Sequence, residues 1–365
     1  MILGENIGNV FSEGREIQQV YSYGRLVWEK ESTDYSLLPF TIKALVDNVS
    51  IKLNDDDTGE DAVVFKYSIN DGEYIETTTE TTITINNNNR LTIIGADIYR
   101  CTITGLCDVC GNIMSVIYGD DFIGQTVMPY SIDGFFGRIS GSLLSGGSDI
   151  RNAKNLILPA TTLVNYCYRN MFYECHSLIT APKILPAMTL TRWCYDCMFF
   201  DCPNLRTAPE LPATTLATKC YHDMFYECSK LTKAPELPAT VMADECYSNM
   251  FYGCGLTKAP ELPATTLAYE CYYGMFTRCF NLTTAPELPA TTLVNGCYRY
   301  MFADCNSLNY IKCYATGVET GYKIKDCIDY WTYSIESTGT LVCNRSYANT
   351  LKKYIPSTWT VEYFT

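Results

Sequence analysis

Histidine is nearly absent from this chain, which has only His176 and His222 among its 365 residues. Histidine is a common general base and metal ligand, so its scarcity excludes most histidine-based catalysis and metal chemistry. Basic residues are also in short supply: 27 Lys and Arg stand against 40 Asp and Glu, and the net charge is −13. That balance argues against a surface that binds nucleic-acid phosphates.

Long apolar runs are missing as well. No stretch approaches the roughly 18 apolar residues of a membrane span, and the opening residues lack the basic and apolar regions of a secretory signal. We therefore expect no membrane insertion. The sequence also has none of the common phosphate-binding, zinc-protease or serine-hydrolase motifs. We expect no enzyme and no cofactor, although carboxylate pairs leave a glycan-cleaving activity open.

An internal repeat dominates the second half of the chain. Six copies begin at a Leu-Pro pair, and each is 25 to 27 residues long: Leu158, Leu185, Leu211, Leu237, Leu262 and Leu288 open them. A period of this length is typical of a leucine-rich-repeat solenoid. In the third copy Leu216, Cys220, Met224 and Cys228 stand four apart. This spacing predicts a short helix or helical turns in each coil.

The segments before the repeat are short, β-branched and separated by turn residues, which predicts a β-sandwich. Six such segments are predicted as strands: 39–46, 49–54, 62–69, 81–86, 91–96 and 101–106. The predicted fold class is mixed α/β, a β-sandwich followed by a leucine-rich-repeat solenoid of about six coils. The predicted parts are a β attachment segment with a hairpin near Tyr23-Gly24 (1–32), the sandwich (33–125), a degenerate coil and N-cap (126–157), the solenoid (158–313) and a C-terminal cap (314–365).

Nineteen cysteines are present, an odd number, and twelve of them recur at two positions of the repeat. The first set is Cys167, Cys194, Cys220, Cys246, Cys271 and Cys297; the second is Cys175, Cys202, Cys228, Cys254, Cys279 and Cys305. Free cysteine behaves as a small buried hydrophobe, so we predict two ladders of buried thiols. Disulfides within or between coils are the alternative.

Two short motifs have half the spacing of a zinc site: Cys107-x-x-Cys110 and Cys194-x-x-Cys197. Neither has a second pair at a suitable distance, so we expect no metal site. The acidic run from Asn54 to Asp61 lacks the ligand pattern of a calcium-binding loop and is interpreted as a solvated turn.

The unit Met-Phe-x-x-Cys-x-x-Leu, as in Met171-Phe172…Cys175…Leu178, resembles the BspA-type leucine-rich repeats over about residues 158–313. Those repeats form solenoids in bacterial surface and adhesion proteins. The order of modules is similar to proteins of gut anaerobes and their phages. The opening Val20-Tyr21…Gly24-Arg25-Leu26-Val27-Trp28-Glu29 resembles N-terminal segments of phage and prophage structural proteins. The resemblance implies non-enzymatic binding.

We therefore expect a structural or recognition protein of a phage or prophage virion, such as a fibre or tail-associated appendage. Its partners would be a protein or glycan on a host cell surface, or neighbouring virion proteins. A homo-oligomer is left open, with a trimer in the case of a fibre. The alternative is a BspA-type adhesin on the bacterial cell surface, and a glycan-processing enzyme comes third.

The candidate binding residues lie at variable positions beside Cys-Tyr and Met-Phe in the coils: Arg169, Trp193, His222, Tyr273, Arg299 and Tyr300. The fixed spacing of the repeat predicts that these side chains form columns on one face of the solenoid. These residue types are enriched at binding hot spots, although variable surface positions also drift without function. A second column consists of Glu210, Glu236, Glu261 and Glu287, which follow Ala-Pro in successive coils. It is interpreted either as a solvated row or as a site for divalent cations or a basic partner.

Overall fold

The structure is a computed structural model that describes residues 33–53, 63–79, 81–137 and 147–364, together with four short strands among the first 32 residues. Those strands are β1 (Phe11–Ser12), β2 (Arg15–Glu16), β3 (Gln19–Ser22) and β4 (Arg25–Glu29). β3 and β4 pair antiparallel where the hairpin is predicted. Tyr23-Gly24 and the acidic run at 54–61 lie outside the described residues.

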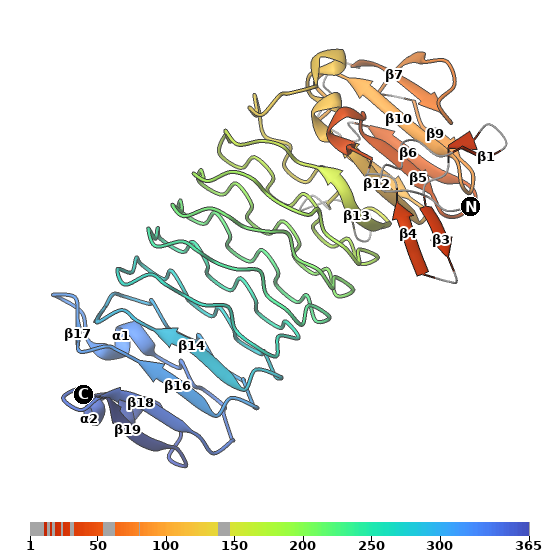
Figure 1. Ribbon diagram of the computed structural model, residues 1–365. Coiled ribbons are helices and arrows are strands. Elements are labelled where there is room, and N and C mark those ends of the chain that lie inside the picture. The colour runs from red at the N-terminus through yellow and green to blue at the C-terminus, as the bar shows by residue number, and fades with distance from the viewer. Residues whose placement is uncertain are drawn as a thin grey trace.

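Two sheets form the N-terminal part (Figure 1). The larger sheet has the order β13-β12-β5-β10-β7-β8 and the smaller one the order β11-β6-β9. Their strands are β5 (Thr41–Ala44), β6 (Val49–Leu53), β7 (Val64–Ile69), β8 (Ile75–Thr78), β9 (Ile83–Ile85), β10 (Arg90–Gly95), β11 (Cys101–Thr104), β12 (Cys107–Asn112) and β13 (Ile150–Ile157). Short 3₁₀ helices lie beside them: η1 (Tyr35–Leu37), η2 (Ile113–Val116) and η3 (Gly119–Asp121).

The burial pattern of these strands follows their sequence alternation. In β6, Val49, Ile51 and Leu53 are buried while Ser50 and Lys52 are half-buried. Successive side chains of a strand point to opposite faces, so the three apolar residues pack on one side. Both sheets contribute to a single hydrophobic core in the way a sandwich does.

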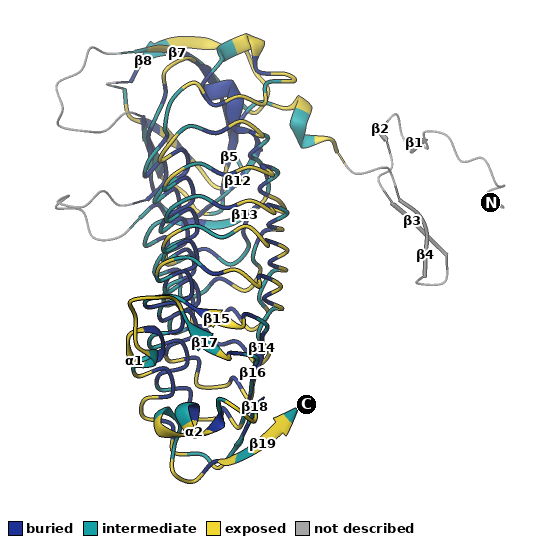
Figure 2. Cartoon of the chain, turned by 90° about the vertical axis from the view of Figure 1, so that its left-hand side faces the viewer, coloured by how far each residue is buried: buried dark blue, intermediate teal, exposed yellow. Residues whose placement is uncertain are grey.

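The larger sheet continues directly into the repeat region. β13 pairs parallel with β12, and it bridges the first coil through Asn152 and Thr180. The core is continuous across this junction, where the Phe136 and Phe172 rings lie 5.3 Å apart. Figure 2 shows buried residues running along the inside of the molecule from the sheets to the far end of the stack.

Successive coils stack in register through the backbone. The Tyr168 N–H donates to the Cys194 carbonyl (2.8 Å), and the Tyr195 N–H donates to the Cys220 carbonyl (3.0 Å). The side chains repeat with the backbone: the Tyr168 and Tyr195 rings lie 5.8 Å apart and nearly parallel at 4°. Identical residues thus lie on identical residues, which fills the interior with columns of Tyr, Phe, Met, Leu and Cys.

The predicted fold class, mixed α/β with a leucine-rich-repeat solenoid, is wrong. The structure is mostly β, and only 7% of it is helical. The coil segments predicted as helices are chains of turns. The Met224 N–H donates to Tyr221, three residues back, while the Phe225 N–H donates to Met250 in the next coil. An α-helix would instead bond each N–H four residues back within its own segment.

Left-handed residues explain this outcome. In the third coil Lys219, Asp223 and Glu227 have φ of 55°, 52° and 56°, and the same three places are left-handed in the other coils. A left-handed residue at every fourth position ends each turn before a helix can propagate. The strict four-residue spacing of buried side chains fits this arrangement better than a helix, where three such steps drift by about 120° around the axis.

The C-terminal part continues the register of the coils. β14 (Thr284–Leu288), β16 (Tyr310–Cys313), β18 (Thr340–Asn344) and β19 (Thr360–Phe364) form a parallel sheet, and β15 (Thr292–Leu293) pairs with β17 (Gly317–Val318). The helices here are α1 (Ile324–Ile328), α2 (Ala348–Leu351) and η4 (Lys352–Tyr354). None of the helices among the described residues has the length and apolar character needed to cross a bilayer.

Candidate functional site

The variable positions form columns on one face of the stack. Tyr221, Met224 and Phe225 are buried, so the two residues between Tyr221 and Met224 lie at the outside of the coil. Inter-coil bonds hold these outer pairs in register: the Cys197 N–H donates to the His222 carbonyl (2.9 Å), and the Asn249 N–H donates to the Tyr273 carbonyl (2.7 Å). All six predicted binding residues are half-buried on this face, which we call the variable face.

Trp193 is the centre of the N-terminal half of the variable face. Its ring stacks on Tyr166 at 6.0 Å and 23°, and the Lys219 Nζ lies 4.5 Å from the ring centroid. The Trp193 Nε1 atom is buried without a hydrogen-bond partner. Trp193 itself has a left-handed φ of 62°, so the turn geometry described above sets the direction of its side chain.

Arg169 is fixed beside this aromatic pair. Its guanidinium makes an ion pair with Asp133 (Nη2 to Oδ2, 2.5 Å) and lies 4.8 Å from the Tyr166 ring centroid. A shallow hollow of about 490 Å³ opens here, lined by Tyr99, Ser131, Asp133, Tyr166 and Arg169. Asp133 comes from the degenerate coil expected before the repeat, whose Gly134 N–H donates to the Arg169 carbonyl (2.8 Å).

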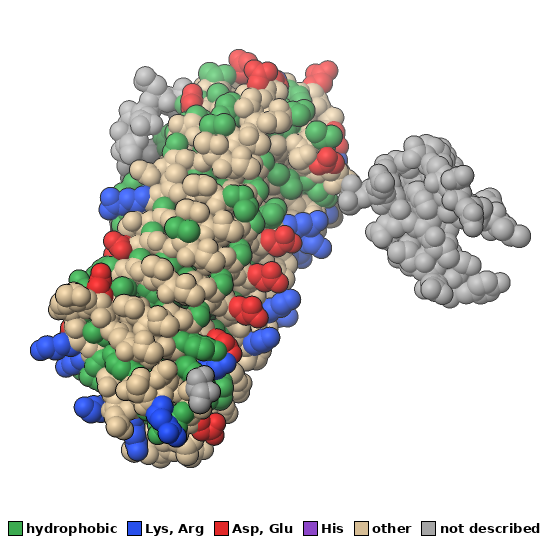
Figure 3. All heavy atoms as spheres, turned by 60° about the vertical axis from the view of Figure 1, so that its left-hand side comes forward, with side chains coloured by type: hydrophobic (Ala, Val, Ile, Leu, Met, Phe, Trp, Pro, Cys, Tyr) green, Lys and Arg blue, Asp and Glu red, His purple; other side chains and the backbone are tan. Residues whose placement is uncertain are grey.

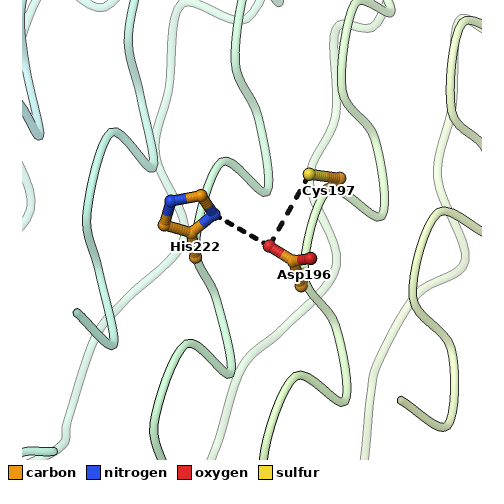
Figure 4. Close-up of side chains that lie close together, drawn as sticks. All are labelled: Asp196, Cys197 and His222. Atoms are coloured by element: carbon orange, nitrogen blue, oxygen red, sulfur yellow. Dashed lines mark hydrogen bonds and ion pairs between the residues drawn. The ribbon is translucent and has the colours of Figure 1, made fainter. Parts of the chain in front are cut away.

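His222 links two coils through acidic partners (Figure 4). Its Nδ1 lies 2.8 Å from Asp196 Oδ1 and 3.3 Å from Asp223 Oδ2. Burial alone would lower the pKa of His222, but the hydrogen bond to Asp196 and the two carboxylates outweigh it, so this pKa is raised. Burial also raises the pKa of Asp223.

Cys197 also belongs to this group. The structure separates it from Cys194, the other cysteine of the Cys194-x-x-Cys197 motif. Cys194 lies in the interior thiol ladder, whereas Cys197 lies on the variable face with its Sγ 3.6 Å from Asp196 Oδ1. The two cysteines therefore do not act as a pair. Ligand atoms of Asp196, Cys197 and His222 all lie within 4.8 Å of one another, a juxtaposition that the spacing along the chain does not reveal.

The C-terminal half of the variable face is a tyrosine cluster. Tyr273 packs edge-on against Tyr300 at 5.6 Å, and Tyr300 stacks on Tyr330 at 5.1 Å. The Arg299 guanidinium lies 5.7 Å from the Tyr300 centroid. Tyr330 and Tyr333, which are 45% and 57% exposed, extend this cluster and are not among the predicted binding residues.

The sequence around these two tyrosines resembles that of the preceding coil. Cys327-Ile328-Asp329-Tyr330-Trp331 follows the pattern of Cys297-Tyr298-Arg299-Tyr300-Met301, and the Phe302 N–H donates to the Trp331 carbonyl (2.8 Å). Residues 329–334, directly after α1, therefore make a further degenerate turn segment that stacks on the last predicted coil.

The acidic column lies on a different side, where Pro interrupts the inter-coil ladder. Grooves of about 600 and 780 Å³ separate adjacent coils here, with Glu210 and Glu236 in the first and Glu236 and Glu261 in the second. Glu287 is paired with Lys312 (2.7 Å), whose hydrogen bond lowers the pKa of the carboxyl group. Figure 3 shows acidic and basic side chains interspersed along one edge of the molecule.

The two thiol ladders match the prediction. All nineteen cysteines are free, and the twelve in the repeat are buried. Those of the second ladder donate to the coil before: the Cys228 thiol to the Phe199 carbonyl (3.2 Å) and the Cys254 thiol to the Phe225 carbonyl (3.1 Å). Burial raises the pKa of these thiols, which keeps them protonated and unreactive.

Comparison with known proteins identifies no relative. No protein-family model, no curated protein and no solved structure matches the chain.

Proposed function

We propose that this chain is a non-enzymatic recognition protein that binds its partner through the variable face. The observation that supports this proposal is that each coil contains two distinct sets of residues. The repeated residues form a buried framework, and the residues that differ between coils place aromatic and cationic side chains on one face. A partner lying along that face would contact several coils at once, and Trp, Tyr and Arg are the residues that most often dominate binding energy.

The aromatic side chains of the variable face are packed against neighbouring side chains of the same chain. Trp193 is held by Tyr166 and Lys219, and Tyr300 by Tyr273 and Tyr330. Side chains that are already ordered lose little conformational entropy on association, so more of the contact energy appears as affinity.

Within this class we propose a phage or prophage virion appendage that binds a host-surface protein or glycan, or another virion protein. The support is the resemblance of the opening segment and of the module order to phage structural proteins. The alternative, a BspA-type bacterial surface adhesin, rests on the resemblance of the repeat. Mass spectrometry of purified particles and of the bacterial surface fraction separates the two: the virion proposal requires the chain in the particles.

The experiment for recognition itself is a host-cell and glycan binding assay with product analysis. The purified full-length chain should be retained by cells or by a glycan and should leave the ligand intact. Release of shortened glycans would instead identify an enzyme. Absence of retention on cells, glycans and virion proteins alike would contradict recognition.

A further inference from the structure

The group around His222 has a composition found nowhere else on the variable face. Four residues at equivalent places of two successive coils, Asp196 and Cys197 in one and His222 and Asp223 in the next, bring two carboxylates, a thiol and an imidazole together. Among the described residues it is the one group of three or more His, Cys, Asp or Glu side chains close enough to hold a metal ion.

We propose that Asp196, Cys197 and His222 form a binding site for Zn²⁺, with Asp223 as the fourth ligand. The ligand atoms are Asp196 Oδ1, Cys197 Sγ and His222 Nδ1, all within 4.8 Å of one another, and Asp223 Oδ2, 3.3 Å from the imidazole nitrogen. Bond lengths of about 2.0–2.3 Å to a tetrahedral zinc ion separate its ligands by about 3.3–3.8 Å. Zinc binding therefore requires the three grouped ligand atoms to close from within 4.8 Å and the Asp223 side chain to turn toward them.

The donor set selects the metal class. A thiolate and an imidazole are poor ligands for Ca²⁺ and Mg²⁺, which take oxygen donors. Sulfur, nitrogen and carboxylate oxygen around one point suit zinc and its neighbours among the divalent transition metals.

The polar groups of this site satisfy one another only in part. Asp223 Oδ1 is buried without a hydrogen-bond partner, and the neutral Cys197 thiol lies against the Asp196 carboxylate. Metal binding would release the thiol proton and free Nδ1 of its proton, leaving the imidazole protonated at Nε2 alone. The positive ion would then neutralise charge that Asp196 and Asp223 concentrate in a site whose side chains are only 6% and 17% exposed.

Such an ion would connect the second coil to the third beside Trp193, whose ring lies 6.3 Å from the His222 ring. The site does not depend on whether the variable face binds a partner, because its four ligands come from this chain alone.

The test is metal binding by the purified full-length chain after treatment with a chelator. Titration with Zn²⁺ should show one ion per chain and a rise in melting temperature. Co²⁺ should give a thiolate-to-metal charge-transfer band. Cys197→Ser and His222→Ala should each weaken Zn²⁺ binding by at least about tenfold, because loss of a residue that only orients a ligand already costs about ten- to a hundredfold. Cys197→Ser should also abolish the cobalt band, and circular dichroism should confirm the fold of both variants.

The chain offers matched controls. Cys110 is the other half-buried cysteine, and His176 is the other histidine. Cys110→Ser and His176→Ala should bind Zn²⁺ as the wild type does. Absence of stoichiometric binding by the wild type, a missing cobalt band, or unchanged affinity in Cys197→Ser would each overturn the site.

Discussion

At the scale of the residue, the repeated cysteines serve packing. Each second-ladder thiol fills a small apolar space and donates to a carbonyl of the preceding coil, as Cys254 does to Phe225. A thiol is smaller than a branched aliphatic side chain and is also a weak donor, which explains why alanine or valine would fit less well.

Removal of one such thiol should therefore have a modest effect. Cys254→Ala should lower the free energy of unfolding by about 1 kcal/mol, because a small volume is lost and one weak hydrogen bond disappears. Reductant should leave the melting temperature of the wild type unchanged. Without reduction, the denatured chain should have nineteen free thiols that react with a thiol reagent. A lower thiol count, or a melting temperature that falls in reductant, would indicate disulfides.

His222 gives the stability a defined dependence on pH. Its pKa in the folded state is raised above the ordinary 6.5, so its stabilising contribution is complete below that pH and is lost as the pH rises through the folded-state pKa. In chelator, the stability difference between wild type and His222→Gln should shrink from about pH 6 to pH 8. His176→Gln is the control, and its stability should depend on pH as that of the wild type does. If the stability of His222→Gln depended on pH in the same way as that of the wild type, another group would be responsible.

At the scale of the element, the left-handed residues define the coil. In the sixth coil Gly296, Tyr300 and Asp304 occupy these places, with φ of 67°, 57° and 58°. Asp304→Val should cost about 1–2 kcal/mol, because a β-branched residue is strained in this region, whereas Asp304→Gly should cost little. Chemical denaturation of both variants measures the difference. Equal losses in the two would mean that the aspartate side chain, and not the backbone angle, matters there.

Much of the local structure could be predicted from the sequence. The six β-branched segments before the repeat correspond to β5, β6, β7, β9, β10 and β11, whereas β8 and β12 are not among the predicted strands. The helix prediction failed because a four-residue spacing of buried side chains fits both a helix and a chain of turns. The deciding information, a left-handed Lys219 or Trp193, involves residues with no intrinsic preference for that conformation. Stacking on neighbouring coils imposes it.

The candidate site was only partly predictable for a related reason. Fixed repeat spacing placed Arg169, Trp193 and His222 on one face correctly. The approach of Cys197 to His222 depends on the lateral alignment of two coils, which pairs residues 25 apart. The spacing of residues within one coil, such as Cys194-x-x-Cys197, does not predict that Cys197 lies near His222.

At the scale of the whole molecule, the C-terminal residues close the stack. Five N–H groups of the last repeat coil donate to residues 326–333: those of Gly296, Tyr298, Tyr300, Phe302 and Asp304. Trp331 is fully buried on the same end, and its Nε1 donates to the Tyr354 carbonyl (2.6 Å). Deletion of 314–365 would expose this end to water and to other chains.

A fragment that ends at residue 313 should therefore aggregate, because unpaired backbone donors and apolar side chains are exposed together. Size-exclusion chromatography and thermal unfolding of the fragment beside the full-length chain measure this. A soluble monomer with a cooperative transition would show that the last coil needs no cover.

Recognition by the variable face is most directly tested by one binding comparison. Trp193→Ala and Tyr273→Ala should each weaken binding to host cells or the identified partner by about 1–2 kcal/mol, roughly five- to thirtyfold, with the fold intact by circular dichroism. Phe280 provides the control, because it is 46% exposed but does not belong to the variable face. Phe280→Ala should bind like the wild type. Unchanged binding in both Trp193→Ala and Tyr273→Ala would contradict the account and assign recognition to another surface.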